Sequence, residues 1–279
     1  MTPNTLQISE KFFSIQGEGW TTGVPAYFIR LTGCNLSCGL GSKGLIELSK
    51  HLKTLSKDEY RAGGFDHQFA NLFKDNKATW VCDSASVWLR GSETHYEDIV
   101  NDWKKEKIFE WIKENRTHII WTGGEPTLPN HQKSICEFLD WLYVKHEIKA
   151  FNEIETNGTV PITSELLNHL DQINCSVKLA NSGMTKSRRI NPEAINSIMS
   201  HDNYWFKFVI SSEEDLKEIN SDFIESFNIP GDRIIIMPGL DRQEDLFERT
   251  KMTLELAKKY GFIGTTRLHV AGWGSVTGV

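Results

Sequence analysis

Residues 26–38 read AYFIRLTGCNLSC and combine a strand pattern with two cysteines. The first six residues of this stretch are mostly apolar, aromatic or β-branched, which is typical of a strand buried in a sheet. Gly33 and the cysteines Cys34 and Cys38 follow directly after that strand. Parallel α/β folds bind their ligands at the carboxyl ends of the strands. The stretch therefore predicts a sheet and marks the first candidate for a functional site.

Short apolar runs of the same kind alternate with helical patterns along the rest of the chain. We expect further strands at 118–121, 149–155, 176–179, 205–210, 233–237 and 267–270. We expect helices at 97–114, around 135–142, and at 244–260 with Gly261 as the carboxyl-terminal cap. This alternation predicts an α/β fold with a mostly parallel sheet, either open or forming a partial barrel.

Composition narrows the class of protein. The 279 residues carry a formal net charge of -6, which speaks against a protein whose main task is to bind nucleic acid. No run approaches the roughly 20 apolar residues of a membrane helix, and the first residues lack a secretory signal pattern. The five cysteines are too few for a disulfide scaffold. We expect a cytoplasmic protein with free thiols that binds neither nucleic acid nor membrane.

One segment interrupts the alternation of strands and helices. Residues 39–81 are polar and rich in lysine, with one helical pattern of leucines at 45, 48, 52 and 55 and a pair of glycines at 63 and 64. No internal repeat or low-complexity segment accompanies it. We interpret the chain as a single domain over 1–279 with an insertion at about 39–81.

The two cysteines after the first strand are the first candidate for chemistry. Thiolates at positions 34 and 38 can bind one soft metal centre together. Two buried structural cysteines, or half of a zinc site, would give the same pattern. A zinc site needs further ligands, and no second Cys-x-x-Cys or paired histidine cluster follows.

Two glycine-rich stretches are further candidates. Residues 121–126, WTGGEP, follow a predicted strand, so the glycines would let the backbone approach a ligand and Glu125 would offer an acceptor. A simple strand-to-helix turn with Pro126 near the first helical position is the alternative. Residues 15–19, IQGEG, form a glycine-rich loop that lacks the setting of a dinucleotide-binding fingerprint.

Taken together as an ordered set, these stretches are much more specific. The set comprises residues 13–19, 23–38, 82–84 (CDS), 122–126 (TGGEP), 155–158 (ETNG), 176–178 (SVK) and the end of the chain from 268. It resembles the 7-carboxy-7-deazaguanine synthase family of the radical S-adenosylmethionine (SAM) superfamily, over nearly the whole chain except the insertion. The resemblance implies a single-domain partial (β/α) barrel of the radical SAM type with a helical insertion in the cluster-binding loop.

The chain departs from the superfamily at the third cluster cysteine. The usual spacing is C-x3-C-x2-C, but after Cys38 the chain continues with glycines and the next cysteine is Cys82. The resemblance implies that the insertion splits the loop, and that Cys34, Cys38 and Cys82 together bind a [4Fe-4S] cluster. Loop closure over that length costs little extra entropy. The alternative is that Cys82 is a small buried residue and the cluster is lost. Cys136 and Cys175 are expected in the core.

The resemblance also implies roles for individual residues. For SAM and its surroundings it implies Gly124, Glu125, Glu155, Asn157, Ser176, Lys178 and Asp83. For the pterin substrate it implies Ile15, Gln16, Gly17, Arg30 and Thr122, with Arg30 pairing with the substrate carboxylate. The hydroxyl of Ser84 is expected to bind Mg²⁺, and His269 is a further candidate near the substrate.

The expected reaction converts 6-carboxy-5,6,7,8-tetrahydropterin to 7-carboxy-7-deazaguanine with loss of ammonia. The family further implies an electron donor such as flavodoxin and a homodimer. One alternative is a radical SAM enzyme with another substrate, such as a glycyl-radical activase. Others are a non-catalytic zinc-binding module and a cluster-free relative that only binds pterins.

Overall fold

The computed structural model describes residues 4–54, 72–240, 243–274 and 278. Among them, nine strands form one sheet in the order β3-β1-β2-β4-β5-β6-β7-β8-β9. Strand β1 runs antiparallel to both its neighbours, and every pair from β2 to β9 is parallel. The strands are β1 (Thr5–Ile15), β2 (Pro25–Leu31), β3 (Ser92–His95), β4 (His118–Gly123), β5 (Asn152–Thr156), β6 (Gln172–Cys175), β7 (Tyr204–Ile210), β8 (Ile234–Pro238) and β9 (Ile263–Gly264). The predicted α/β fold with a mostly parallel sheet is confirmed.

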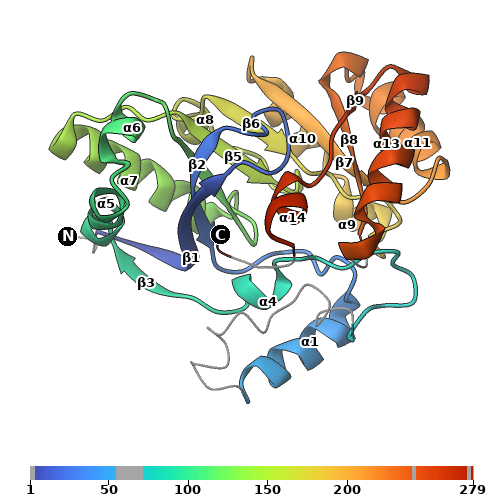
Figure 1. Ribbon diagram of the computed structural model, residues 1–279, viewed down its shortest axis with the longest axis horizontal. Coiled ribbons are helices and arrows are strands. Elements are labelled where there is room, and N and C mark those ends of the chain that lie inside the picture. The colour runs from blue at the N-terminus through green and yellow to red at the C-terminus, as the bar shows by residue number, and fades with distance from the viewer. Residues whose placement is uncertain (1–3, 55–71, 241–242, 275–277, 279) are drawn as a thin grey trace.

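Helices connect the parallel strands and cover the outer face of the curved sheet (Figure 1). A large core lies between them and the sheet, with fully buried Trp103, Trp121, Phe138 and Phe206 among its members. The α-helices are α1 (Gly41–Leu52), α4 (Ala85–Trp88), α5 (Tyr96–Lys105), α6 (Phe109–Lys113), α7 (Pro129–His146), α8 (Ser164–Leu167), α9 (Lys186–Arg189), α10 (Pro192–Met199), α11 (Glu214–Ile219), α12 (Glu225–Phe227), α13 (Leu246–Tyr260) and α14 (Leu268–Trp273). None of the helices in the described ranges is long and apolar enough to span a membrane.

Local sequence explains several element boundaries. Helix α7 begins at Pro129, whose fixed φ suits a first helical turn. Helix α13 ends at Gly261, which adopts a left-handed conformation as predicted. The helix predicted at 97–114 is divided into α5 and α6, because Lys107 has a positive φ of 61° and ends the first helix. Strand β1, which the prediction did not include, directly precedes the glycine-rich loop.

Two predicted strands are wrong. Strand β6 ends at Cys175, and residues 176–179 leave the sheet as an irregular segment at its carboxyl end. Residues 268–270 form the start of α14 rather than a strand, and Arg267 directly precedes the helix. In the first case the real strand reads QINC, whose polar residues hide it from a search for apolar runs.

In the described part of the segment at 39–81, helix α1 lies on the side of α4, away from the sheet (Figure 1). Its predicted helix is confirmed as α1, which packs Leu48 and Leu52 against Leu40, Val81 and residues of α4. The expected helical position Leu55 and the glycine pair at 63 and 64 lie outside the described residues. That this segment is an insertion within a single domain stays a prediction.

Candidate functional site

A cavity of about 240 Å³ lies at the carboxyl ends of the parallel strands. Loops from distant parts of the sequence meet there, as the fold class predicts. Almost all of the predicted site residues line it: Ile15, Gln16, Gly17, Arg30, Cys34, Cys38, Cys82, Asp83, Ser84, Thr122, Gly124, Glu155, Asn157, Ser176, Lys178 and His269. The exception is Glu125.

The three cysteines Cys34, Cys38 and Cys82 occupy one wall of this cavity. The backbone N–H of Cys82 donates to the carbonyl of Cys38 at 3.2 Å, so the chain returns from residues 39–81 directly beside the point where it left. Gly39 makes this return possible. It has a φ of +79°, and a Cβ there would overlap the Trp80 carbonyl and Val81 Cα. The backbone thus places the distant third cysteine beside the other two.

All five cysteines of the chain are free thiols. Burial raises the pKa of Cys38 to about 12, although nearby Lys178 opposes the rise. Burial and Glu125 also raise the pKa of Cys34 strongly. These groups are therefore neutral thiols unless a metal centre takes up their charge as thiolates.

The arrangement of the thiols distinguishes between kinds of metal centre. Within the described ranges, no three His, Cys, Asp or Glu side chains converge closely enough to hold a single ion. A structural zinc ion requires four ligands around one point. In an iron-sulfur cluster, by contrast, each thiolate binds a different iron, so the ligands surround a space. Three cysteines that line one cavity match the number of thiolates that hold a [4Fe-4S] cluster with one open iron, and that they bind such a cluster stays a prediction.

Glu125, which was expected in the surroundings of SAM, is bound by groups of its own chain. Its carboxylate is fully buried and accepts hydrogen bonds from the Thr127 N–H and hydroxyl, the Thr156 hydroxyl and the Asn157 N–H, at 2.7 to 2.9 Å. It therefore fixes the loop after β5. The prediction that it accepts from the SAM amino group gains no support from this geometry.

Gly124, which precedes Glu125 in the TGGEP motif, allows two backbone segments to come into close contact. A Cβ at Gly124 would overlap the Gly33 carbonyl, and the Glu125 N–H donates to that same carbonyl at 2.9 Å. The glycine thus lets two strand-end turns touch, the TGGEP turn and the turn before Cys34. Gly124 also lines the cavity, and its expected contact with SAM stays a prediction.

Polar residues follow β5 and β6 close to the cysteines. Asn157 Nδ2 donates to Asn35 Oδ1 at 2.9 Å and lies 3.8 Å from Cys34 Sγ. Lys178 Nζ donates to Ser176 Oγ at 2.8 Å and lies 5.8 Å from the centre of the Trp80 ring. This wall offers an amide, a hydroxyl and an ammonium group to a polar ligand beside the thiols.

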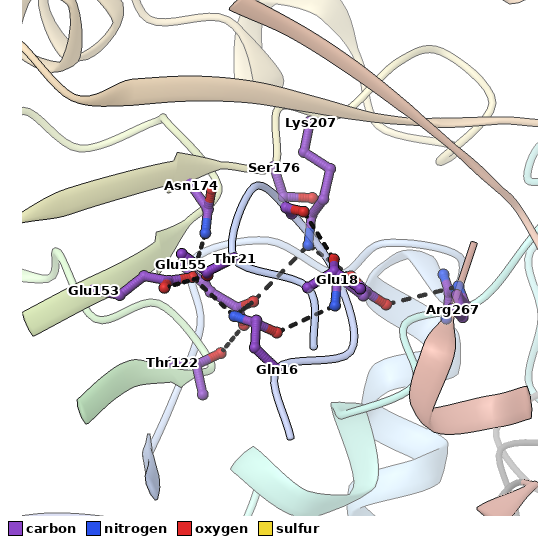
Figure 2. Close-up of polar contacts among 12 residues, drawn as sticks. Gln16, Glu18, Thr21, Thr122, Glu153, Glu155, Asn174, Ser176, Lys207 and Arg267 are labelled. Carbon is purple, nitrogen blue, oxygen red and sulfur yellow. Dashed lines mark hydrogen bonds and ion pairs between the residues drawn. The ribbon is translucent and has the colours of Figure 1, made fainter. Parts of the chain in front are cut away.

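The opposite part of the cavity is formed by the loop after β1. Gln16 Nε2 donates to Glu153 Oε1 at 2.8 Å and to Glu155 Oε1 at 3.3 Å, while Thr122 Oγ1 donates to Glu155 Oε2 at 2.8 Å (Figure 2). Glu153 is fully buried behind this layer and also accepts from Thr21 and Asn174. The side-chain amide of Gln16 is therefore held in one orientation.

Arg30 is the candidate for binding a substrate carboxylate. Its Nε lies 3.2 Å from Glu10 Oε2, and its guanidinium carbon is 5.5 Å from the centre of the Phe12 ring. Burial raises the pKa of Glu10, and Arg30 opposes that rise. The guanidinium lines the cavity and already has a carboxylate and an aromatic ring to orient it.

The sequence prediction missed three charged residues of the cavity: Glu18, Lys207 and Arg267. Lys207 lies in the fully buried strand β7, and its Nζ is 2.6 Å from Glu18 Oε2 and 3.9 Å from Glu155 Oε1 (Figure 2). Burial alone would raise the pKa of Glu18, but Lys207 and Arg267 lower it to about 2. A lysine inside the otherwise apolar run YWFKFVI was the sequence signal that could have revealed this group.

Ser84 and Asp83 lie beside the third cysteine. Ser84 Oγ is 3.5 Å from both Cys82 Sγ and the Gly123 carbonyl oxygen. Asp83 Oδ2 accepts from Arg267 Nη1 at 2.9 Å. The two side chains provide oxygen atoms at the edge of the cavity, which is the donor type that Mg²⁺ prefers.

Comparisons with known proteins agree with this picture. No family model matches the chain. The chain is 28% identical to the 7-carboxy-7-deazaguanine synthase of Pyrobaculum aerophilum, over 98% of this chain and 97% of that protein. It is 27% identical to the synthase of Halobacterium salinarum, over 96% of this chain and 90% of that protein. The resemblance inferred from the motifs is confirmed.

A solved structure supports the fold. The crystal structure of QueE from Escherichia coli matches with a TM-score of 0.53 at 20% identity, covering 93% of this chain and 92% of that one. The match confirms the predicted fold class, a partial (β/α) barrel with a mostly parallel sheet.

Proposed function

We propose that this relative of the 7-carboxy-7-deazaguanine synthases is a radical SAM enzyme that converts 6-carboxy-5,6,7,8-tetrahydropterin to 7-carboxy-7-deazaguanine with loss of ammonia. Full-length similarity to synthases from two organisms supports this reading. The observation that carries it is the single cavity at the strand ends, where three cysteines from two distant segments lie together with the predicted pterin-binding residues. A structural role alone would not require both sets to line one space.

The residues for the cofactors form one half of the cavity. Cys34, Cys38 and Cys82 would hold a [4Fe-4S] cluster, which with SAM supplies hydrogen-abstraction chemistry when bound. The hydroxyl of Ser176 and the ammonium of Lys178 would bind the polar groups of SAM, together with Gly124 and Asn157.

Residues that line the other half of the cavity would bind the pterin substrate. Glu155 presents a carboxylate that accepts hydrogen bonds, and Thr122 and Gln16 hold it in place. The N–H groups on the edge of a pterin are donors that match such an acceptor. Arg30 would pair with the substrate carboxylate, and the backbone of Ile15 and Gly17 would lie against the flat ring system.

Ser84 would bind Mg²⁺ through its hydroxyl, with Asp83 beside it. From the family resemblance we further expect a cytoplasmic homodimer that receives electrons from a donor such as flavodoxin. A radical SAM enzyme with another substrate, such as a glycyl-radical activase, is less well supported, because the relatives that match nearly the whole chain are deazaguanine synthases.

A pair of cysteine variants tests the assignment. Cys82→Ala should fail to bind iron and sulfide after anaerobic reconstitution and should form no product from the carboxytetrahydropterin. Cys136→Ala, in which a buried core cysteine is changed, should retain both iron and turnover. If Cys82→Ala keeps a cluster that cleaves SAM, the third ligand is assigned wrongly.

A further inference from the structure

The segment of residues 267–274, which comprises Arg267, helix α14 and Gly274, forms one wall of the cavity. Arg267, His269, Val270 and Gly274 all line it. Yet none of the residues of α14 is buried, and none belongs to a hydrophobic core cluster. Helices in proteins are normally held by burial of an apolar face. This wall must therefore be held in place by other contacts.

Polar and backbone contacts at the start of the segment take that role. The Leu268 N–H donates to the Gly17 carbonyl at 2.9 Å. The ring of His269 packs so closely on the same loop that a Cβ at Gly17 would overlap it. Arg267 is the one buried residue of the segment, with 6% of its surface exposed. The segment is thus attached at one end, through Arg267 and its two neighbours.

Arg267 joins two loops of the cavity. Its Nη1 donates to Asp83 Oδ2 at 2.9 Å, in the residue after the third cysteine. Its Nε lies 3.8 Å from Glu18 Oε1, in the loop after β1 (Figure 2). This buried Nε has no hydrogen-bond partner, so Glu18 holds it by charge alone. One guanidinium therefore spans the cluster side and the substrate side of the cavity.

Lys207 completes the arrangement from the sheet. It pairs with the other oxygen of Glu18, so that this carboxylate lies between two cations (Figure 2). Strand β7 is buried at every position, which makes Lys207 a rigid anchor. The chain of charges then runs from Lys207 through Glu18 and Arg267 to Asp83, and it fixes the relative position of four otherwise separate segments.

We propose that Arg267 is a positioning residue, which fastens residues 267–274 across the substrate loop and the cluster loop and so closes the cavity over bound substrate. The inference rests on the proposed function and deepens it. A cavity closed in this way keeps the pterin and SAM together, so SAM cleavage is coupled to product formation. Loosening the wall should release the substrate before it reacts, while the thiols stay in place.

The test compares Arg267→Met and Arg267→Lys with the control Arg249→Met. Arg249 bonds to the Ser211 carbonyl and does not line the cavity. The first readout is amide hydrogen exchange of residues 268–274 in the reconstituted enzyme without substrate. Arg267→Met should raise exchange of the Leu268 amide by about 10- to 100-fold, the scale of a lost charged hydrogen bond. Arg267→Lys should give a smaller increase, and Arg249→Met none.

The second readout is turnover. Arg267→Met should bind the same amount of iron as the parent, raise KM for the pterin more than KM for SAM, and form several-fold more 5′-deoxyadenosine per deazaguanine. Unchanged exchange and unchanged coupling in Arg267→Met would overturn the proposal. If Arg267→Met does not fold, the same criteria apply to Arg267→Lys. A parent enzyme that makes no deazaguanine would refute the proposed function, whereas the exchange result would still decide the role of Arg267 in holding the wall.

Discussion

Replacing Lys207 with methionine should destabilise the protein strongly. Lys207 is 4% exposed in its side chain, and its Nζ lies 2.6 Å from Glu18. Methionine fills a similar volume but removes the cation nearest to Glu18 and Glu155, so that Glu18 keeps only the more distant Arg267. Removing one partner of a buried ion pair typically costs about 3–5 kcal/mol.

The pKa of Glu18 gives the scale of the effect for Lys207 and Arg267 together. It lies at about 2 against a usual 4.5, because the two cations outweigh the effect of burial. At about 1.4 kcal/mol per unit, the net stabilisation is about 3.5 kcal/mol. Because the pKa is depressed, this stability is fully present above pH 4.5 and is lost as the pH falls toward 2. The difference between Lys207→Met and the parent should therefore shrink in the same interval.

The assay is urea unfolding of cluster-free protein under reducing conditions. At neutral pH we expect Lys207→Met to lower the free energy of unfolding by about 3 kcal/mol. Lys207→Met combined with Glu18→Gln should recover part of the loss, because the buried carboxylate that has lost its nearest cation becomes a neutral amide. The control Lys217→Met changes an exposed lysine that pairs with Glu214 three residues away, and it should have no measurable effect. A double variant as unstable as Lys207→Met, or a fully stable Lys207→Met, would refute the reasoning.

Three further predictions concern single side chains. Glu125→Gln should lower the unfolding free energy by about 1–3 kcal/mol, because an amide cannot accept all four hydrogen bonds that the carboxylate accepts. The KM for SAM should not change in this variant, and a large rise in that KM would instead make Glu125 a SAM ligand. Ser84→Ala should weaken the stimulation of turnover by Mg²⁺, and an unaltered Mg²⁺ titration would remove Ser84 from that site. Arg30→Met should raise KM for the carboxytetrahydropterin about 10- to 100-fold, whereas the control Arg116→Met, at an exposed arginine, should leave it unchanged. The same KM in Arg30→Met and in the parent enzyme would show that Arg30 does not bind the substrate carboxylate.

Much of the fold was predictable, because buried parallel strands are apolar on both faces. Strands β2, β4, β7 and β8 follow apolar runs that the sequence shows directly. Strand β6 does not, since it contains the buried polar residue Asn174, whose side-chain amide donates a hydrogen bond to Glu153 on the neighbouring strand. Such a partner is visible only in three dimensions, so periodicity placed the strand four residues too late.

The site residues that belong to sequence motifs were predictable, whereas the buried charged residues of the cavity were not. The motif residues line the cavity as expected, and Cys82 returns to the other cysteines. Arg267 was hidden in a stretch that we expected to be a strand, and Lys207 in an apolar run. Glu125 was given to a ligand, although four donors of its own chain surround it. In each case the deciding contact joins segments that are far apart in the sequence or depends on a turn geometry that spacing does not show.

The most direct test of the central claim is turnover by the complete enzyme. Anaerobically reconstituted protein is incubated with SAM, a reductant, Mg²⁺ and 6-carboxy-5,6,7,8-tetrahydropterin, and the products are identified by mass spectrometry. A cavity lined by both the proposed cluster cysteines and the proposed pterin-binding residues predicts 7-carboxy-7-deazaguanine, formed only when SAM and iron are both present. Iron-loaded protein that cleaves SAM but leaves the pterin intact would contradict the account.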